Sequence, residues 1–201
     1  MKITYILFIS LLITACDKAA PKFERISQNA IILAFGDSLT YGTGVSEDNS
    51  YPSILSQLSS HEVINAGVPG EISQAGLNRL PALLDEIQPE LLVLIHGGND
   101  ILRKIPKQQT HANLMKMIDT ANQRNIKVVM LGVPKPNLFL MDSAEVYHQI
   151  AEQQSTPIDL ETLPDILSNN QLKSDMIHPN QQGYKIMAEN VFNLLKETGA
   201  L

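Results

Sequence analysis

The 201-residue chain has no tryptophan, a single cysteine and few aromatic residues. One cysteine cannot form an internal disulfide, and 5% aromatic residues leave little material for platforms that stack bases or sugar rings. The chain also lacks runs of basic residues and has a formal charge of −6, which argues against nucleic acid as a partner. No histidine, cysteine or acidic cluster has metal-ligand spacing, so we expect neither a metal nor another cofactor.

The sequence does have the composition of one globular domain that follows a distinct N-terminal segment. Hydrophobic residues make up 44% and charged residues 18% of the chain. Lys2 precedes an apolar run of about 13 residues, too short to span a bilayer and typical of a secretory signal peptide. A buried N-terminal helix is the alternative. We expect a signal peptide at 1–15, a tether at 16–29 and one domain at 30–201.

The stretch 12–16, Leu-Ile-Thr-Ala-Cys, resembles a bacterial lipobox. The resemblance implies cleavage before Cys16, which then carries a diacylglycerol and an N-acyl chain. Several acyl chains on one residue give stable anchoring, so we expect a lipoprotein of the bacterial cell envelope, held to a membrane on the periplasmic side. Asp17 resembles an inner-membrane retention signal of enterobacterial lipoproteins, although the sequence leaves open which membrane holds the anchor.

Apolar runs alternate with helical patterns along the rest of the chain. Strands are expected at 31–35, 63–64, 91–95, 128–131 and around 158, and helices at 52–60, 74–88, 109–124, 144–153 and 182–196. Pro81 should bend or restart the second helix. Strands that are apolar throughout belong to parallel sheets covered on both faces. The fold class is therefore α/β, a three-layer α/β/α sandwich with a central, mostly parallel five-stranded sheet.

The first strand runs directly into a Gly-Asp-Ser-Leu stretch at 36–39. A serine on a sharp strand-to-helix turn presents its hydroxyl at the sheet edge and its N–H near a helix N-terminus, where negative charge is stabilised. Gly36 is expected to allow the tight turn. Asp and Ser are also common helix caps, and on this stretch alone capping is the favoured interpretation.

A base for this serine is available near the C-terminus, in Asp-Met-Ile-His-Pro at 175–179. Neutral imidazole is the usual base near pH 7, and Asp175 lies close enough along the loop to fix the tautomer of His178. Pro179 disfavours helix at His178, so a helix should begin near Asn180. The other histidines, 61, 96, 111 and 148, are interpreted as ordinary loop residues, with 96 a weaker candidate for lining the site.

Two further polar loops follow predicted strands. In Gly-Gly-Asn-Asp at 97–100, the Asn99 amide can donate to a developing oxyanion. In Asn-Ala-Gly-Val-Pro-Gly-Glu at 65–71, a glycine can offer an unhindered N–H, while Pro69-Gly70 also suits a type II turn. Each loop alone has the composition of an ordinary turn. Together the four loops supply a nucleophile, oxyanion donors, a base and its orienting acid.

These four blocks, in this order, resemble the SGNH/GDSL hydrolase family, and within it the bacterial arylesterase, thioesterase and lysophospholipase group. The likeness covers roughly 31–195. It implies the nucleophile at Ser38, the acid and base at Asp175 and His178, and an oxyanion hole of Ser38, Gly70 and Asn99.

The sequence departs from the family pattern in three places. Gly-Glu-Ile at 70–72 replaces the frequent Gly-Asp-Thr, Met176 replaces a frequent Gly, and the loop at 134–140 lacks a Tyr often found after its Asn. That last loop tends to line the acyl pocket in the family, so this departure bears on the choice of substrate.

The expected function is a serine esterase that hydrolyses carboxylic esters or thioesters, including aryl esters and lysophospholipids, through an acyl-enzyme. A small-molecule acyl ester or lipid and the membrane are the expected partners, and the resemblance implies an open, shallow site. Two alternatives stay open: an O-acetyl esterase or acyltransferase on envelope carbohydrate, and an inactive lipid-binding lipoprotein. The sequence does not reveal the acyl chain length or the oligomeric state.

Overall fold

The computed structural model describes residues 23–135 and 142–201. The expected signal peptide, Cys16 and most of the expected tether lie outside these residues, as does most of the 134–140 loop. Within the described part, no helix is both long enough and apolar enough to cross a membrane.

Five parallel strands form the central sheet, in the order β2-β1-β3-β4-β5. Their bounds are β1 Ile31–Gly36, β2 Glu62–Gly67, β3 Leu91–Ile95, β4 Lys127–Leu131 and β5 Ile158–Asp159. All five predicted strands are present and all pairs are parallel, which confirms the predicted fold class. Pairing with β1 extends β2 beyond the expected 63–64, and pairing with β4 extends β5 by one residue beyond 158.

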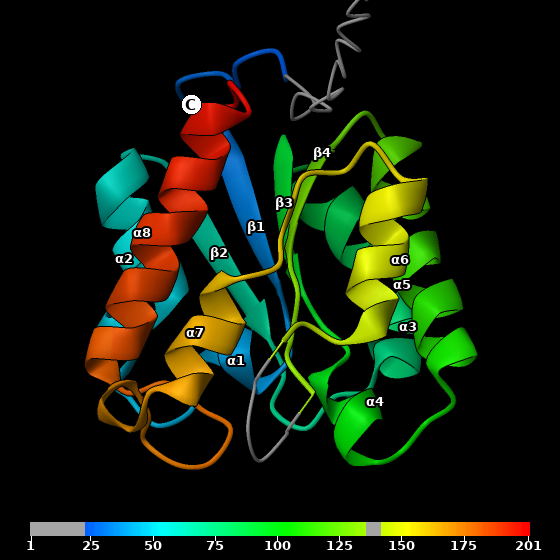
Figure 1. Cartoon of the computed structure of the whole chain (residues 1–201). Coiled ribbons are helices and arrows are strands. Elements are labelled where there is room, and N and C mark those ends of the chain that lie inside the picture. Colours follow the sequence, from blue (N-terminus) through cyan, green and yellow to red (C-terminus); the bar gives the residue numbers. More distant parts are fainter. Residues whose placement is uncertain (1–22, 136–141) are drawn as a thin grey trace, which may run out of the picture.

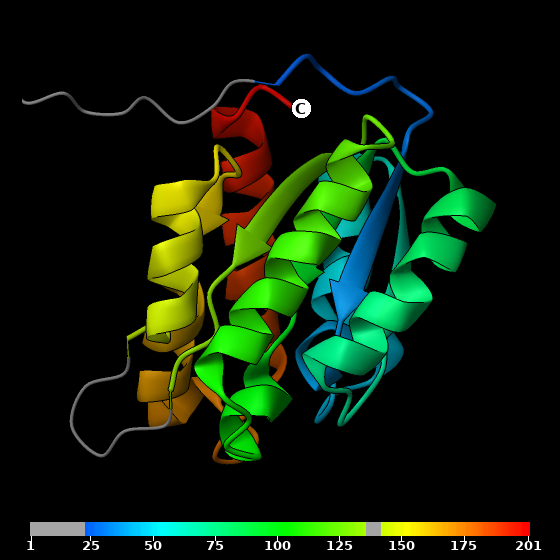
Figure 2. The same ribbon diagram turned by 90° about the vertical axis from the view of Figure 1, so that its right-hand side faces the viewer.

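Helices cover both faces of the sheet, as Figures 1 and 2 show. The longer helices are α2 Tyr51–Ser59, α3 Ser73–Ile87, α5 Lys107–Asn122, α6 Glu145–Gln153, α7 Thr162–Ser168 and α8 Gln181–Glu197. In Figure 1, α2, α7 and α8 form one layer, and α3, α5 and α6 form the other. Two short helices, α1 Ser38–Tyr41 and α4 Gly98–Leu102, lie at one end of the sheet.

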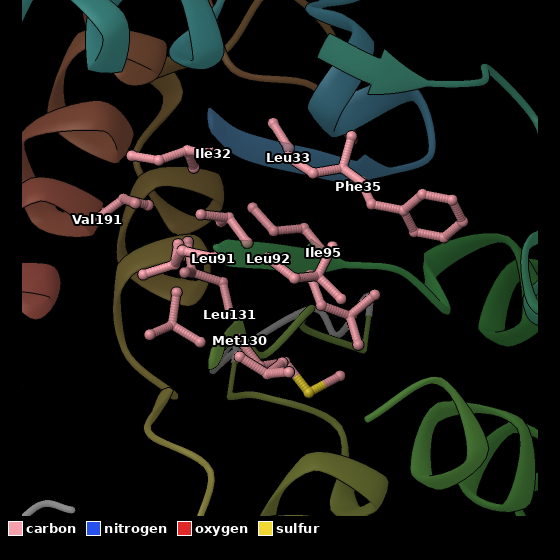
Figure 3. Packing of buried hydrophobic residues seen from close by; sticks show 14 of the residues in the cluster. Ile32, Leu33, Phe35, Leu91, Leu92, Ile95, Met130, Leu131 and Val191 are labelled. Atoms are coloured by element: carbon pink, nitrogen blue, oxygen red, sulfur yellow. The ribbon is translucent and has the colours of Figure 1, made fainter. Parts of the chain in front are cut away.

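The core consists of the apolar strands and the inward faces of the helices. Every residue of β3 is buried, and Val191 of α8 belongs to the same cluster (Figure 3). Because alternate side chains of a strand point to opposite faces, each apolar strand contributes to both layers of the core. Among the described residues, the buried hydrophobic side chains run from Ile26 to Ala200 and belong to one cluster, so this part of the chain has one continuous core.

Pro81 lies inside α3, which continues from Ser73 to Ile87, so the helix does not restart there, and the expected bend stays a prediction. Proline in a helix interior removes one hydrogen bond and costs about 3 kcal/mol. Leu80 and Leu84, which are buried on the same helix, contribute about 1.5–3 kcal/mol each by burial, enough to offset that loss.

The site is set by the point where the chain reverses its direction across the sheet. The chain passes from β1 to β2 on one side and then returns to β3 on the other side of β1. The carboxyl ends of β1 and β3 are therefore neighbours with no connection between them, which is where open α/β sheets place their functional groups. α1 follows β1 there, and α4 follows β3 (Figure 1).

Candidate active site

Ser38 is the first residue of α1, directly after β1. Asp37 is the N-cap, and its Oδ1 accepts a hydrogen bond of 3.1 Å from the Leu39 N–H. Capping and presentation of the serine therefore coexist on one turn. Gly36 is needed for space and not for a tight turn, because a Cβ there would lie 2.0 Å from the Ile95 carbonyl oxygen. Only glycine allows β1 and β3 to approach so closely beside the serine.

Ser38, His178 and Asp175 form one hydrogen-bonded chain. The Ser38 Oγ lies 2.9 Å from His178 Nε2, and His178 Nδ1 lies 2.7 Å from Asp175 Oδ2. The serine and histidine are 140 residues apart in sequence. The expected loop conformation of His178 is confirmed, since Asn180 caps α8 and its Oδ1 accepts from the Gly183 N–H.

The Asp175 carboxylate also holds its own loop. Its Oδ1 accepts hydrogen bonds from the backbone N–H groups of Ile177 and His178, at 2.8 and 2.9 Å. Partial burial pushes the pKa of Asp175 upward, but the hydrogen bonds from His178 and from these two amides outweigh it and lower the pKa. Asp175 is thus held ionised next to the imidazole, which favours the tautomer with its proton on Nδ1.

The loop after β2 forms a type II turn, with the Glu71 N–H bonded to the Val68 carbonyl at 3.1 Å. Gly70 has φ +78°, as the third position of that turn requires. Its N–H makes no hydrogen bond within the described residues, and its carbonyl accepts from Arg103 at 2.8 Å. Gly70 does not line the pocket at Ser38. It lies beside the pocket and is joined through Arg103 to the end of α4.

Asn99 is the second residue of α4, and its side chain reaches back to both neighbouring loops. Its Nδ2 donates to the Glu71 carbonyl at 3.0 Å and to Asp37 Oδ2 at 3.2 Å. Burial raises the pKa of Asp37, although nearby His96, the Leu39 amide and the Asn99 amide oppose this.

A partly buried ionic cluster lies beneath the 68–71 turn that carries Gly70, and sequence reasoning missed it. Arg79 Nε donates to both carboxylate oxygens of Glu71, at 2.8 and 3.0 Å, and His96 Nε2 lies 3.0 Å from Glu71 Oε2. Arg79 Nη2 donates to the carbonyls of Ala66, at 2.8 Å, and Gly36, at 3.2 Å. The guanidinium also stacks 4.0 Å from the centre of the Phe35 ring.

This cluster joins the ends of β1 and β2 to the loop that carries Gly70. His96 is fully buried within it, so this histidine is neither a loop residue at the surface nor part of the pocket lining. Desolvation would raise the pKa of Glu71, but hydrogen bonds and charge from His96 and Arg79 outweigh it and lower the pKa. His111 and His148 lie on α5 and α6, as the helices expected at 109–124 and 144–153 imply, so the interpretation of these two as loop residues is wrong.

Asp100, the last residue of the 97–100 block, makes hydrogen bonds that hold α3 and α5 in place. Its Oδ2 accepts from the Ser73 N–H at 2.7 Å, at the beginning of α3, and its Oδ1 accepts from Thr110 at 3.2 Å. Ile72, which stands at the N-cap of α3, makes no side-chain capping bond. Asp100 therefore satisfies the helix end that Ile72 leaves open.

A pocket of about 500 Å³, including its open mouth, lies at Ser38. Its polar lining comes from Asp37, Ser38, Gly98, Asn99 and His178. Its apolar lining comes from Leu39, Leu102, Val133, Pro134, Leu167, Met176 and Ile177. Leu167 lies on α7, a helix that was not predicted, although Pro164 and Asp165 in its first turn are helix-start signals. No group of three or more potential metal ligands occurs in the described ranges.

Comparison with known proteins places the chain in a family. Residues 34–186 match the model of the GDSL-like lipase/acylhydrolase family, which is most of the chain. The chain belongs to that family. The family inferred from the four sequence blocks is thereby confirmed, as is the expected function of an ester hydrolase.

Relatives of this GDSL-like hydrolase include two curated enzymes and a solved structure. It is 31% identical to "Thioesterase 1/protease 1/lysophospholipase L1" of Escherichia coli strain K12, over 79% of each chain. It is 30% identical to "Arylesterase" of Vibrio mimicus, over 91% of this chain and 94% of the relative. The crystal structure of TesA aligns with a TM-score of 0.75 and 29% identity, over 84% of this chain and 99% of that one. A related chain with almost nothing outside the aligned region thus folds as a unit.

Proposed function

We propose that Ser38 is the nucleophile of a two-step ester hydrolysis. His178 takes the Ser38 proton as the Oγ attacks the substrate carbonyl, and then gives that proton to the departing alcohol or thiol. Water, activated by the same imidazole, attacks the acyl-enzyme and releases the acid. The observation that carries the proposal is the continuous Ser38–His178–Asp175 chain, with bonds of 2.9 and 2.7 Å, at the mouth of the pocket.

The negative charge that develops on the carbonyl oxygen needs donors. The Ser38 N–H is at the first position of α1, where a helix leaves its amides unpaired. The unpaired Gly70 N–H and the Asn99 amide come from the two adjoining loops. We assign the oxyanion hole to these three groups, and each contributes a donor that is already held in place by the fold.

The pocket supports an acyl ester or thioester as substrate. Its apolar lining on α4, α7 and the 175–178 loop suits an alkyl or aryl group, and its few polar groups converge on Ser38. The relatives named for thioesterase, lysophospholipase and arylesterase activity support the same class. We therefore propose aryl esters, acyl thioesters and lysophospholipids as the substrates to test first.

The lipid anchor at Cys16 and the position in the envelope are likewise proposals, supported by the lipobox-like stretch at 12–16 alone. Expression of the full chain in a bacterium, followed by mass analysis of the membrane fraction, tests them. Addition of diacylglycerol and an acyl chain to Cys16, and its loss in Cys16→Ser, is the expected result. Unmodified protein in the soluble fraction would contradict the anchor and leave the hydrolase assignment unaffected.

The catalytic assignment is tested with the domain Asp17–Leu201 and a fluorophosphonate probe. We expect labelling of the wild type and none of Ser38→Ala or His178→Ala, with circular dichroism to show that both variants fold. A p-nitrophenyl ester series of increasing chain length then bounds the acyl pocket. Labelling of folded Ser38→Ala would refute the nucleophile. A folded wild type without labelling or hydrolysis would favour a binding lipoprotein.

A further inference from the structure

The large hydrophobic side chains that remain exposed are concentrated around the active site. The described residues include five of them: Tyr41 at 55%, Leu58 at 39%, Val68 at 41%, Leu102 at 45% and Met176 at 83% exposure. All but Leu58 lie on the loops and short helices that carry Ser38, Gly70, Asn99 and His178. Scattered exposed hydrophobic residues are normal, but one on each of the four catalytic segments is a pattern that marks an interaction surface.

The four side chains belong to one continuous rim. Tyr41 and Val68 are adjacent because Gly67 packs against the Tyr41 backbone and the Asn65 side chain donates to the Tyr41 carbonyl. The Val68 turn is tied to the end of α4 by the bond from Arg103 to Gly70. Leu102, next to Arg103, lines the same pocket as Met176. We call Tyr41, Val68, Leu102 and Met176 the apolar rim.

A group of cations lies beside the apolar rim. Arg103, Lys104 and Lys107 follow Leu102 along the chain, all exposed. Lys104 and Lys107 line one hollow together with exposed Lys135, and Glu145 is the acidic side chain in its lining. The chain as a whole has a charge of −6, so the excess of positive charge here, near the carboxyl ends of the strands, is opposite in sign to the net charge of the protein. Apolar side chains flanked by cations are the composition that binds an anionic lipid surface.

We propose that the apolar rim and the adjoining cations dock the active site onto an anionic lipid surface, so that acyl esters enter the pocket from the lipid. Leu102 and Met176 belong to both the rim and the pocket wall, which gives a continuous apolar path from the lipid to Ser38. The proposal deepens the proposed hydrolase function by naming how its substrate is presented. A second copy of the chain or a protein partner on the rim is the competing occupant, which the experiment below detects.

The absence of tryptophan allows a direct test, because a single introduced tryptophan is then the sole source of tryptophan emission. Tyr41→Trp reports on the rim. Leu58→Trp is the control, since Leu58 is also an exposed hydrophobic residue, at 39% against 55% for Tyr41, but lies on α2. Both are made in Asp17–Leu201 with Ser38→Ala, so that the lipids stay intact. The vesicles are an equal mixture of phosphatidylethanolamine and phosphatidylglycerol, or phosphatidylcholine alone.

Emission of Tyr41→Trp should shift to shorter wavelength with the anionic vesicles, and less with phosphatidylcholine, whereas Leu58→Trp should not shift. No shift at Tyr41→Trp, or equal shifts at both positions, would overturn the proposal. A shift without lipid that grows with protein concentration would also overturn it, in favour of a protein interface. These readouts do not depend on hydrolysis. The docking proposal can therefore fail while the Ser38 assignment stands, and the Ser38 assignment can fail while the docking proposal stands.

A second experiment measures ester hydrolysis by the enzyme with Ser38 intact. Tyr41→Ser/Val68→Ser should lower hydrolysis of a long-chain ester in anionic vesicles by about tenfold and leave a soluble short-chain ester unaffected, because the changed side chains lie outside the pocket lining. Leu58→Ser should affect neither substrate. Equal losses on both substrates, or no loss on vesicles, would refute the docking role.

Discussion

Arg79→Met tests whether the ionic cluster of Arg79, Glu71 and His96 holds the 68–71 turn, which carries Gly70, in place. Methionine keeps much of the apolar stem over Phe35 but removes the guanidinium. The Glu71 carboxylate, with a side chain only 7% exposed, would then keep His96 as its partner. The carbonyls of Gly36 and Ala66 would lose the bond from Arg79, although Gly36 keeps the Val68 N–H at 3.0 Å. Removing one partner of a buried pair costs about 3–5 kcal/mol. Because the Arg79 side chain is 24% exposed, we take the lower end, about 3 kcal/mol.

The measurement is urea unfolding of Asp17–Leu201 alongside short-ester kinetics. With a slope of about 2 kcal/mol per molar, the unfolding midpoint should fall by about 1.5 M. We also expect kcat to fall about tenfold, less than the loss of a whole oxyanion donor, because Asn99 depends on the Glu71 carbonyl for its position. A midpoint shift under about 0.5 M with unchanged kcat would refute the supporting role of the cluster.

Adding Glu71→Gln to Arg79→Met provides the internal control. The double variant has no Glu71 carboxylate left without its Arg79 partner, so it should regain part of the lost stability, and the difference from additivity measures the Arg79–Glu71 interaction. The effect should also depend on pH. The pKa of Glu71 is lowered in the folded state from its usual 4.5, so its contribution is present above that pH and is lost as pH falls through the folded-state pKa. The gap between wild type and Arg79→Met should therefore narrow below about pH 4.5.

Three further substitutions test the site and the core. Asp175→Asn should lower kcat by about 10⁴ with little change in unfolding midpoint, because it leaves the imidazole with the wrong tautomer; a loss under tenfold would count against the Asp175 role. Asn99→Ala should lower kcat by about 10²–10³ in the same ester assay, and an unchanged kcat would remove Asn99 from the oxyanion hole. Leu92→Ala, at a fully buried position of β3, should cost about 2–5 kcal/mol by urea unfolding, and a smaller loss would indicate that the core collapses around the cavity.

The elements that the sequence predicted well are those in which composition and burial agree. β3 is apolar at every position and buried at every position, so its run of residues is sufficient to define it. The loops that follow β1 and β3 meet because parallel strands bring their carboxyl ends to one edge, and this topology could be predicted from alternating strands and helices. The contact between Asp175 and His178 could be predicted because the two residues are only three positions apart.

Long-range contacts between polar side chains could not be predicted in the same way. Arg79 has no sequence feature that distinguishes it from a solvated helix residue, yet it contacts Gly36, 43 positions earlier, and Ala66. Its partner Glu71 replaces a frequent family Asp, and the structure shows a side chain that reaches both Arg79 and His96. Such contacts depend on where two elements pack, which neither propensity nor periodicity contains.

The helix α8 runs from the catalytic loop to the point where the N-terminal segment joins the domain. Its N-cap, Asn180, lies two residues after His178, and Thr198 at its other end accepts a hydrogen bond from the Phe23 N–H. Seventeen helical residues span about 25 Å. If Cys16 carries the proposed anchor, the seven Cα–Cα steps from Cys16 to Phe23 extend over at most about 25 Å, about the length of α8. An anchored molecule could bring its apolar rim to its own bilayer only with this tether fully extended, so we expect the rim to dock on lipid presented opposite, and a longer tether to favour hydrolysis in the bilayer that holds it.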